Sequence, residues 1–227
     1  MSTYSDLGIE LMVTGENAGT WGTKTNNNLN LIEQLTGGFA TLSIAGGAGT
    51  QALDIDDGAL TGTAQQKIIE FTGSITGNRV ITIPNDVETF YILKNSTSGA
   101  YTVQFKYATG SGSSTTFSST DKGIKTVYAS ANDGTNPDIV DVMANSSEIV
   151  LANNNPIKFN DADNSAFVGI DAPATVSGSY TLTLPAAVGS ASQALVTTDG
   201  AGTLGFTSTS TFGITTGKAI AMAIVFG

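Results

Sequence analysis

The sequence predicts a mainly β protein, in which one N-terminal helix is followed by a β-sandwich or jelly-roll-like domain and then by an elongated, intertwined β-shaft. Three observations predict this class. The 227 residues include 33 Thr, 27 Gly, 21 Ser and 16 Asn, which favour strands and turns. Short apolar runs recur between turn residues along most of the chain. A clear helical period is confined to one segment near the N-terminus.

The helical segment covers residues 21–35, within an N-terminal anchoring segment of residues 1–39. Its large apolar side chains are spaced to lie roughly on one side of a helix, and they are Trp21, Leu29, Ile32 and Leu35. Thr20 or Thr23 can cap its start, and Gly37 and Gly38 end it. Because the three asparagines at 26–28 are poor helix formers, we expect this helix to depend on packing against another part of the protein.

Residues 40–145 carry short β-branched or aromatic runs at regular spacing, which is typical of a sandwich or jelly-roll-like domain. The clearest run is 101–107, where every odd position is large and apolar and every even position is polar. Such alternation predicts a strand with one face in a core and one face in water.

Residues 146–227 are predicted to form a β-rich shaft with an apolar C-terminal strand. Few large side chains lie between residues 146 and 212, too few to enclose a core within one chain. We therefore expect several copies of the chain to share one core. The run 219–226 is apolar on both faces, with the larger side chains on one of them, namely Ile220, Met222, Ile224 and Phe226. These four residues and the four helix residues are the predicted anchoring or oligomer interface.

Composition excludes several kinds of chemistry. Without His there is no imidazole base, and without Cys there are no disulfides, thiol nucleophiles or cysteine metal sites. The net charge of −10 and the single arginine argue against nucleic acid or an anionic membrane as a partner. Residues 1–10 lack a secretory signal, and the longest apolar run, 219–226, is too short to cross a bilayer, so no membrane insertion is expected.

Two acidic segments invite a metal interpretation, and three carboxylates a catalytic one. Residues 54–58 fail the calcium-loop spacing, since position 12 is Gln65, and residues 160–164 are better explained as a side-chain-bonded turn. Asp138, Asp141 and Glu88 could in principle hydrolyse a glycan, but no pattern brings two of them together. We therefore predict no enzyme activity, no cofactor and no bound metal.

Several segments resemble tail-fibre-like virion structural proteins of marine tailed phages, of the cyanophage type. The resemblance is carried by Gly-Glu-Asn-Ala-Gly-Thr-Trp-Gly-Thr-Lys-Thr-Asn-Asn-Asn-Leu-Asn-Leu-Ile-Glu at 15–33 and by parts of 71–143, 180–208 and 217–227. It implies a structural protein that is usually a homotrimer, with no cofactor and no catalytic residues.

The expected function is therefore that of a phage virion structural protein, a tail fibre or short tail appendage involved in attachment to the host. The expected partners are further copies of the chain in a trimer, other tail or capsid proteins through the N-terminal segment, and a host surface glycan as a candidate ligand. The expected location is the virion. A capsid decoration or head-fibre protein and an extracellular filament subunit remain alternatives.

Overall fold

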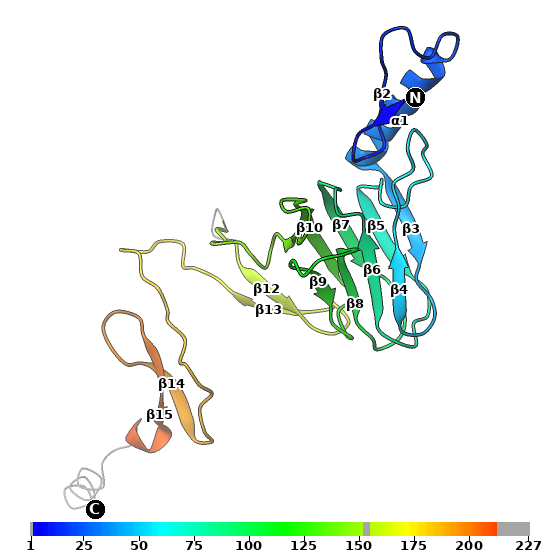
Figure 1. Ribbon diagram of the computed structural model, residues 1–227. Coiled ribbons are helices and arrows are strands. Elements are labelled where there is room, and N and C mark those ends of the chain that lie inside the picture. Colours follow the sequence, from blue (N-terminus) through cyan, green and yellow to red (C-terminus); the bar gives the residue numbers. More distant parts are fainter. Residues whose placement is uncertain (1, 152–154, 213–227) are drawn as a thin grey trace, which may run out of the picture. The chain divides into compact units, whose positions relative to one another are not determined.

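The computed structural model describes residues 2–151 and 155–212 and confirms a mainly β chain with one N-terminal α-helix followed by several sheets (Figure 1). The chain divides into two compact units, Met1–Ile149 and Val150–Gly227. Each unit is described by itself. The predicted strand at 219–226, with Ile220, Met222, Ile224 and Phe226, lies outside the described residues.

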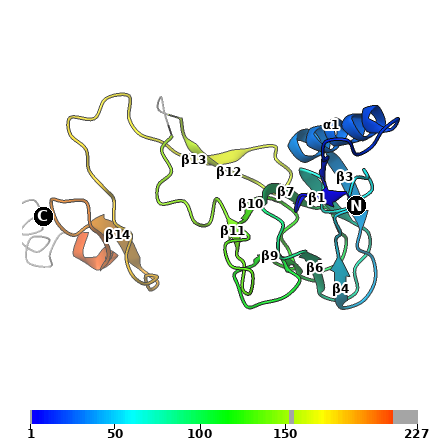
Figure 2. The same ribbon diagram turned by 45° about the horizontal axis from the view of Figure 1, so that its top comes forward.

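The first unit begins with a small antiparallel pair, β1 (Thr3–Tyr4) and β2 (Glu10–Leu11), and the helix α1 (Trp21–Gly37). The predicted helix and its end at Gly37 and Gly38 are confirmed, but neither Thr20 nor Thr23 caps its start with a side-chain hydrogen bond. The Thr20 hydroxyl donates to the Asn17 carbonyl oxygen and caps nothing, and Thr23 lies within the helix. The helix ends where Gly38 turns extended, with its N–H bonded to the Gln34 carbonyl oxygen. Figures 1 and 2 show α1 beyond one end of the sheet strands.

Two sheets follow. The five-stranded sheet has the order β11-β10-β7-β5-β3, and the four-stranded sheet the order β4-β6-β8-β9. The strands of the first are β3 (Phe39–Ser43), β5 (Ile68–Thr72), β7 (Thr89–Asn95), β10 (Ile124–Ala129) and β11 (Ile139–Asp141). Those of the second are β4 (Gly49–Ala52), β6 (Arg79–Ile83), β8 (Val103–Tyr107) and β9 (Thr115–Phe117).

The first six of these strands form three stacked coils, because the chain alternates between the sheets. Each coil consists of one strand in the five-stranded sheet, a turn, and the next strand in the four-stranded sheet. Strands of successive coils that lie in the same sheet therefore pair in parallel. Leu42 stacks beside Phe71 and then Asn95, and Gln51 beside Ile81 and then Phe105. The two sheets make the expected sandwich, but its central strands are parallel, whereas those of a jelly roll are antiparallel. Only β9, β10 and β11 add antiparallel pairs to these sheets.

The turns between the two sheets are stacked as well. Gly46 bridges Ile75, and Ser74 bridges Ser98, both in parallel. Gly99 has φ 99°, and a Cβ there would collide with the Ile75 carbonyl oxygen of the coil beside it. Glycine therefore allows the turns of the second and third coils to lie in contact.

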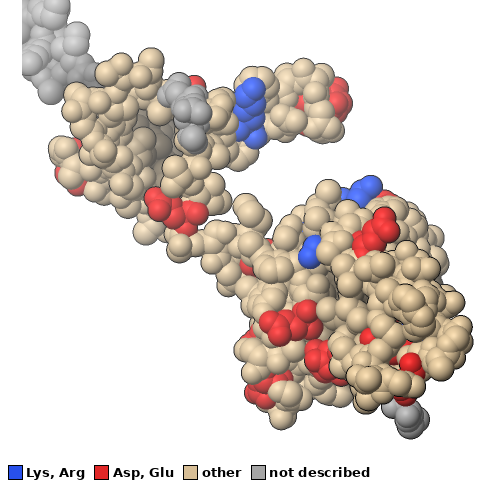
Figure 3. All heavy atoms as spheres, turned by 90° about the horizontal axis from the view of Figure 1, so that it is seen from above, with Lys and Arg blue, Asp and Glu red and all other residues tan. Residues whose placement is uncertain are grey.

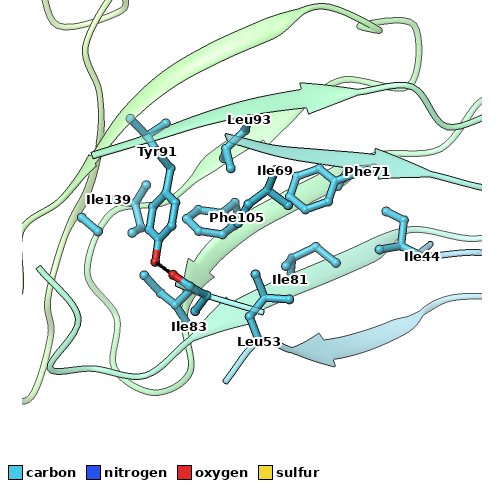
Figure 4. Close-up of a cluster of buried hydrophobic side chains, with 14 of the residues drawn as sticks. Ile44, Leu53, Ile69, Phe71, Ile81, Ile83, Tyr91, Leu93, Phe105 and Ile139 are labelled. Atoms are coloured by element: carbon cyan, nitrogen blue, oxygen red, sulfur yellow. Dashed lines mark hydrogen bonds between the residues drawn. The ribbon is translucent and has the colours of Figure 1, made fainter. Parts of the chain in front are cut away.

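The core lies between the two sheets, and both contribute to it (Figure 4). Tyr91, Leu93, Ile69 and Phe71 of the five-stranded sheet face Ile81, Ile83 and Phe105 of the four-stranded sheet. The buried hydroxyl of Tyr91 donates to the Ala64 carbonyl oxygen at 2.7 Å, and that of Tyr107 to the Val87 carbonyl oxygen at 2.7 Å. Burial raises the pKa of both hydroxyls, that of Tyr107 to about 12, so both stay neutral donors at ordinary pH.

The second unit has no such core in its described residues. It contains two antiparallel hairpins and a short 3-10 helix, and no described side chain of this unit is buried. The hairpins pair β12 (Ile157–Asn160) with β13 (Phe167–Ile170) and β14 (Gln193–Thr197) with β15 (Leu204–Ser208), before the 3-10 helix Thr209–Phe212.

The coil core predicts where the first unit is sensitive to mutation. Ile81 is fully buried in the middle coil, so Ile81→Ala should lower the free energy of unfolding by about 2–5 kcal/mol. Ile124, which is 65% exposed at the start of β10, is the matched control, and Ile124→Ala should change it by less than about 0.5 kcal/mol. Urea unfolding followed by circular dichroism measures both, and equal losses would contradict this placement of the core.

Candidate assembly surfaces

The inner side of α1 is attached to the rest of the protein by polar groups. The Asn28 amide nitrogen donates to the Glu10 carbonyl oxygen at 2.9 Å, and the Glu10 N–H donates to the Asn28 Oδ1 at 2.9 Å. The Asn28 side chain therefore pairs with both backbone groups of Glu10, as a neighbouring strand would. The three asparagines at 26–28 have low helix propensity, but Asn28 attaches the helix to β2 through these two hydrogen bonds.

A buried ion pair strengthens the same contact. The Glu10 side chain is 1% exposed, and its Oε2 lies 2.9 Å from the Lys24 Nζ. Asn17, held at φ 60° between Gly15 and Gly19, donates from Nδ2 to the Glu10 Oε1 at 3.1 Å. The Lys24 ammonium, with smaller contributions from Ser2 and Asn17, lowers the pKa of Glu10, and Glu10 raises the pKa of Lys24. The pair is therefore charged on both sides at neutral pH.

The loop 53–66 receives the rest of the inner side. Asn27 Nδ2 donates to the Gly58 carbonyl oxygen and Gln34 Nε2 to the Leu60 carbonyl oxygen, each at 3.3 Å. Leu31 is the one fully buried side chain of α1. The inner side is thus mostly amides and one ammonium around one fully buried leucine.

The outer side of α1 carries three large apolar side chains, among exposed polar ones, that are uncovered in the described structure. Trp21 is 64% exposed, Leu29 58% and Ile32 46%. A surface helix normally turns its apolar stripe towards the core, and this one does the reverse. Of the four predicted helix residues, the structure brings these three together on the exposed side. The fourth, Leu35, is half-buried and follows Leu31 by one turn, on the inner side.

More apolar surface is exposed after β2, and a groove lies at the end of α1. Leu11, Met12 and Val13, which follow β2, are also exposed. A shallow groove of about 520 Å³ lies where α1 ends, and its apolar walls are Phe39 and Leu60. The remaining lining residues are Asn30, Glu33, Gln34, Thr36, Gly37, Gly38 and Gln66.

The second unit exposes a separate apolar surface on the β12–β13 hairpin. Ile157 pairs with Ile170, and Phe159 with Val168, so these four side chains share one face, which we call the hairpin plate. All four are at least half exposed. The opposite face carries Lys158, whose ammonium lies 4.3 Å from the centre of the Phe167 ring. The segments on either side of the hairpin expose Val150, Leu151, Val176, Tyr180, Leu182, Leu184 and Val188 as well.

The carboxylates considered for chemistry are each occupied by structural contacts. Asp138 accepts from the Ser113 N–H and the Asn132 amide, Asp141 pairs with Lys125 at 3.0 Å, and the Tyr128 hydroxyl donates to Glu88 at 2.6 Å. Hydrogen bonds from Ser113 and Asn132 lower the pKa of Asp138, so this group is a poor general acid.

The two acidic segments considered for metal binding are also internally bonded. The Thr63 hydroxyl and N–H donate to Asp54, and the Thr61 hydroxyl to Asp56. Ser165 donates to Asp161 and Asp163, which closes the β12–β13 turn. Within residues 2–151 and 155–212, no group of three or more acidic residues is placed to hold a metal ion.

Charge is sparse on the surface. Most of the face seen in Figure 3 is uncharged, with carboxylates in scattered groups and few lysines. The single arginine, Arg79, donates from Nη1 to the Gly47 carbonyl oxygen at 2.9 Å, so it supports a turn between coils. No helix in the described part of the chain has the length and apolar character needed to cross a membrane.

Comparisons of this chain with protein-family models, with curated proteins and with solved structures found no match. The surfaces described above are therefore the basis for a functional proposal.

The attachment of α1 predicts the effect of losing Asn28. Asn28→Ala removes both hydrogen bonds to Glu10, a loss of about 1–3 kcal/mol, against a gain of roughly 0.5 kcal/mol in helix propensity. Hydrogen–deuterium exchange should speed up across residues 2–20 and stay unchanged in β6 and β8. Asn30→Ala, on the exposed side of the same helix, is the control and should leave exchange at residues 2–20 unchanged.

The ion pair predicts a pH dependence on the acid side. Because the folded pKa of Glu10 is below its ordinary 4.5, the pair stabilises the fold fully above pH 4.5, and this contribution is lost as pH falls through the lowered pKa. Other carboxylates, such as Glu70 and Asp138, have lowered pKa values and contribute to the same trend. The urea midpoint of Glu10→Gln should therefore fall less steeply below pH 4.5 than that of the unmodified protein, and identical slopes would contradict a native Glu10–Lys24 pair.

Proposed function

We propose that this chain is a structural protein of a phage virion, a tail fibre or short tail appendage that takes part in attachment to the host, and that it works as a homo-oligomer, most simply a trimer. The observation that carries the proposal is the division of the chain into one unit with its own core and one whose described residues enclose none. A protein that must bury so much apolar surface against other chains is suited to assembly rather than to catalysis.

The second unit supports self-association. An isolated two-stranded hairpin is marginally stable in water, and the hairpin plate is uncovered by its own chain in the described structure. The plate itself carries no charge, so copies of a chain with net charge −10 can meet there without bringing carboxylates together. Three plates around one axis would form a shared core, and this core would hold the proposed intertwined shaft together.

The N-terminal layer, which we define as β1, β2, α1 and the segment between β2 and α1, supports anchoring to another virion protein. Leu29 and Ile32 of α1 and the separate Leu11–Val13 segment expose apolar side chains for such a contact, and α1 is held from behind by hydrogen bonds, while Trp21 is left for contact between copies of the chain. A pre-organised helix face of this kind binds a groove on a partner with little loss of conformational entropy. A location in the virion, and a host surface glycan as ligand of the assembled protein, belong to the same proposal.

A second candidate, the extracellular filament subunit, is favoured by the free sheet edges. β3 and β4 end their sheets, and neither contains a charged residue or proline that would block strand addition. Strand addition by another copy at these edges would build a filament.

The first test is oligomeric state. Light scattering on the purified full chain should give a whole multiple of 23.1 kDa, expected to be three. Phe159→Ser alters the plate and should lower the mass, whereas Phe167→Ser, on the opposite face, should preserve it. Deletion of residues 218–227 should also prevent assembly. A stable, folded monomer would contradict the proposal, and growth of mass with concentration would favour the filament.

The second test is location. Antibodies against residues 40–145 should label the tails of negatively stained phage particles. Label on the head would favour capsid decoration, and absence of label on particles that contain the chain by mass spectrometry would contradict an exposed appendage.

A further inference from the structure

We propose that Trp21 of one copy inserts into the groove between the end of α1 and Leu60 of the neighbouring copy. This contact rests on the homo-oligomer proposed above and states how its N-terminal layers meet. It joins two different places on identical chains, so it is a head-to-tail contact.

Trp21 has the properties of an inserting side chain. It is the first residue of α1, it is 64% exposed, and Gly22 beside it leaves the ring unobstructed. It is also the only tryptophan of the chain. Tryptophan gains more from burial than most side chains, and it is enriched among residues that dominate interface energies.

The groove offers what an indole requires. Its volume of about 520 Å³ falls within the range of about 300–1,000 Å³ found for small-molecule sites, so one bicyclic ring fits. Phe39 and Leu60, which are 57% and 40% exposed, provide apolar walls, and Gly37 and Gly38 leave the surface between them open. The Glu33 carboxylate on the rim can accept a hydrogen bond from the indole N–H.

The occupant cannot be the Trp21 of the same chain. The groove is lined from Asn30 to the end of a 17-residue helix, and at 1.5 Å per residue even Asn30 lies about 13 Å along the axis from Trp21, which is farther than an indole reaches. Every copy of the chain carries one Trp21 and one groove of this kind. In a closed assembly each groove can therefore receive one indole from a neighbouring copy. Head-to-tail contacts between identical chains form rings when the rotation closes and filaments when it does not, and a ring of three agrees with the proposed trimer.

Charge does not oppose a second copy at this contact. Each chain carries net charge −10, so two copies repel each other over most of their surfaces. The stripe and the groove together contain one charged residue, Glu33, which the indole N–H can satisfy. This contact is therefore one of the few places where copies can approach closely without setting carboxylates against each other.

The single tryptophan makes the contact directly measurable. In the unmodified oligomer, Trp21 emission should be blue-shifted and protected from acrylamide. Leu60→Glu, which places a second carboxylate beside Glu33, should shift the emission to the red and increase quenching. Phe39→Glu, a second groove variant at an exposed side chain, should do the same. Ile124→Glu, an equally exposed site away from the groove, is the control and should leave the emission unchanged.

A mixing experiment distinguishes head-to-tail insertion from contact between tryptophans. Trp21→Ala chains retain the groove but emit no tryptophan fluorescence, and Leu60→Glu chains retain the indole. When the two are refolded together, emission comes only from Leu60→Glu chains, and it should return towards the blue because their Trp21 enters intact grooves.

The outcomes separate this inference from the proposed function. An oligomer by light scattering with an exposed, freely quenched Trp21 would overturn the insertion and leave the oligomer intact. A blue-shifted oligomer whose groove variants do not shift, or whose mixture shows no recovery, would overturn it as well. A monomer with exposed Trp21 would overturn both.

Discussion

The orientation of α1 depends on two hydrogen bonds between the Asn28 amide and the backbone of Glu10. Because this amide and the Lys24 ammonium occupy the inner side, the helix cannot bury its apolar stripe there without leaving Glu10 unpaired. Trp21, Leu29 and Ile32 consequently face outward. The exposed stripe, the groove at the helix end and the proposed contacts of the N-terminal layer all follow from this polar attachment.

Asparagine has a related role in the coils. The Asn78 carbonyl oxygen accepts from Gly49 of the first coil, and its side-chain Oδ1 accepts from the Thr102 N–H of the third. Asn95, fully buried, donates to the Asp121 carbonyl oxygen and accepts from Thr97. These side chains satisfy backbone groups where the strands end, so the turns can stack as closely as the strands do. The asparagine content of the chain therefore reflects turn and helix attachment more than surface solubility.

The two units differ in where their apolar side chains go. In the first, two sheets enclose isoleucines, valines and aromatic rings, and two buried tyrosines find carbonyl acceptors. In the second, large side chains such as Phe159 and Leu184 are exposed in the described residues. Folding of these described residues gains little free energy from their own contacts, and in the proposed homo-oligomer association supplies the burial that a core supplies in the first unit.

Several features could be predicted from the sequence: the helix, most strands of the first unit, the alternation around Phe105, and a stretch after residue 145 with too few large side chains to enclose a core alone. These features depend on local periodicity and composition. The parallel coils could not be predicted, because the equivalent positions, such as Leu42, Phe71 and Asn95, share a place in space and not a residue type. The attachment through Lys24 and Asn28 could not be predicted either, because their common partner Glu10 lies in another segment of the chain. Only the tertiary structure decided which side of α1 faces outward, because that choice rests on hydrogen bonds between segments far apart in the chain.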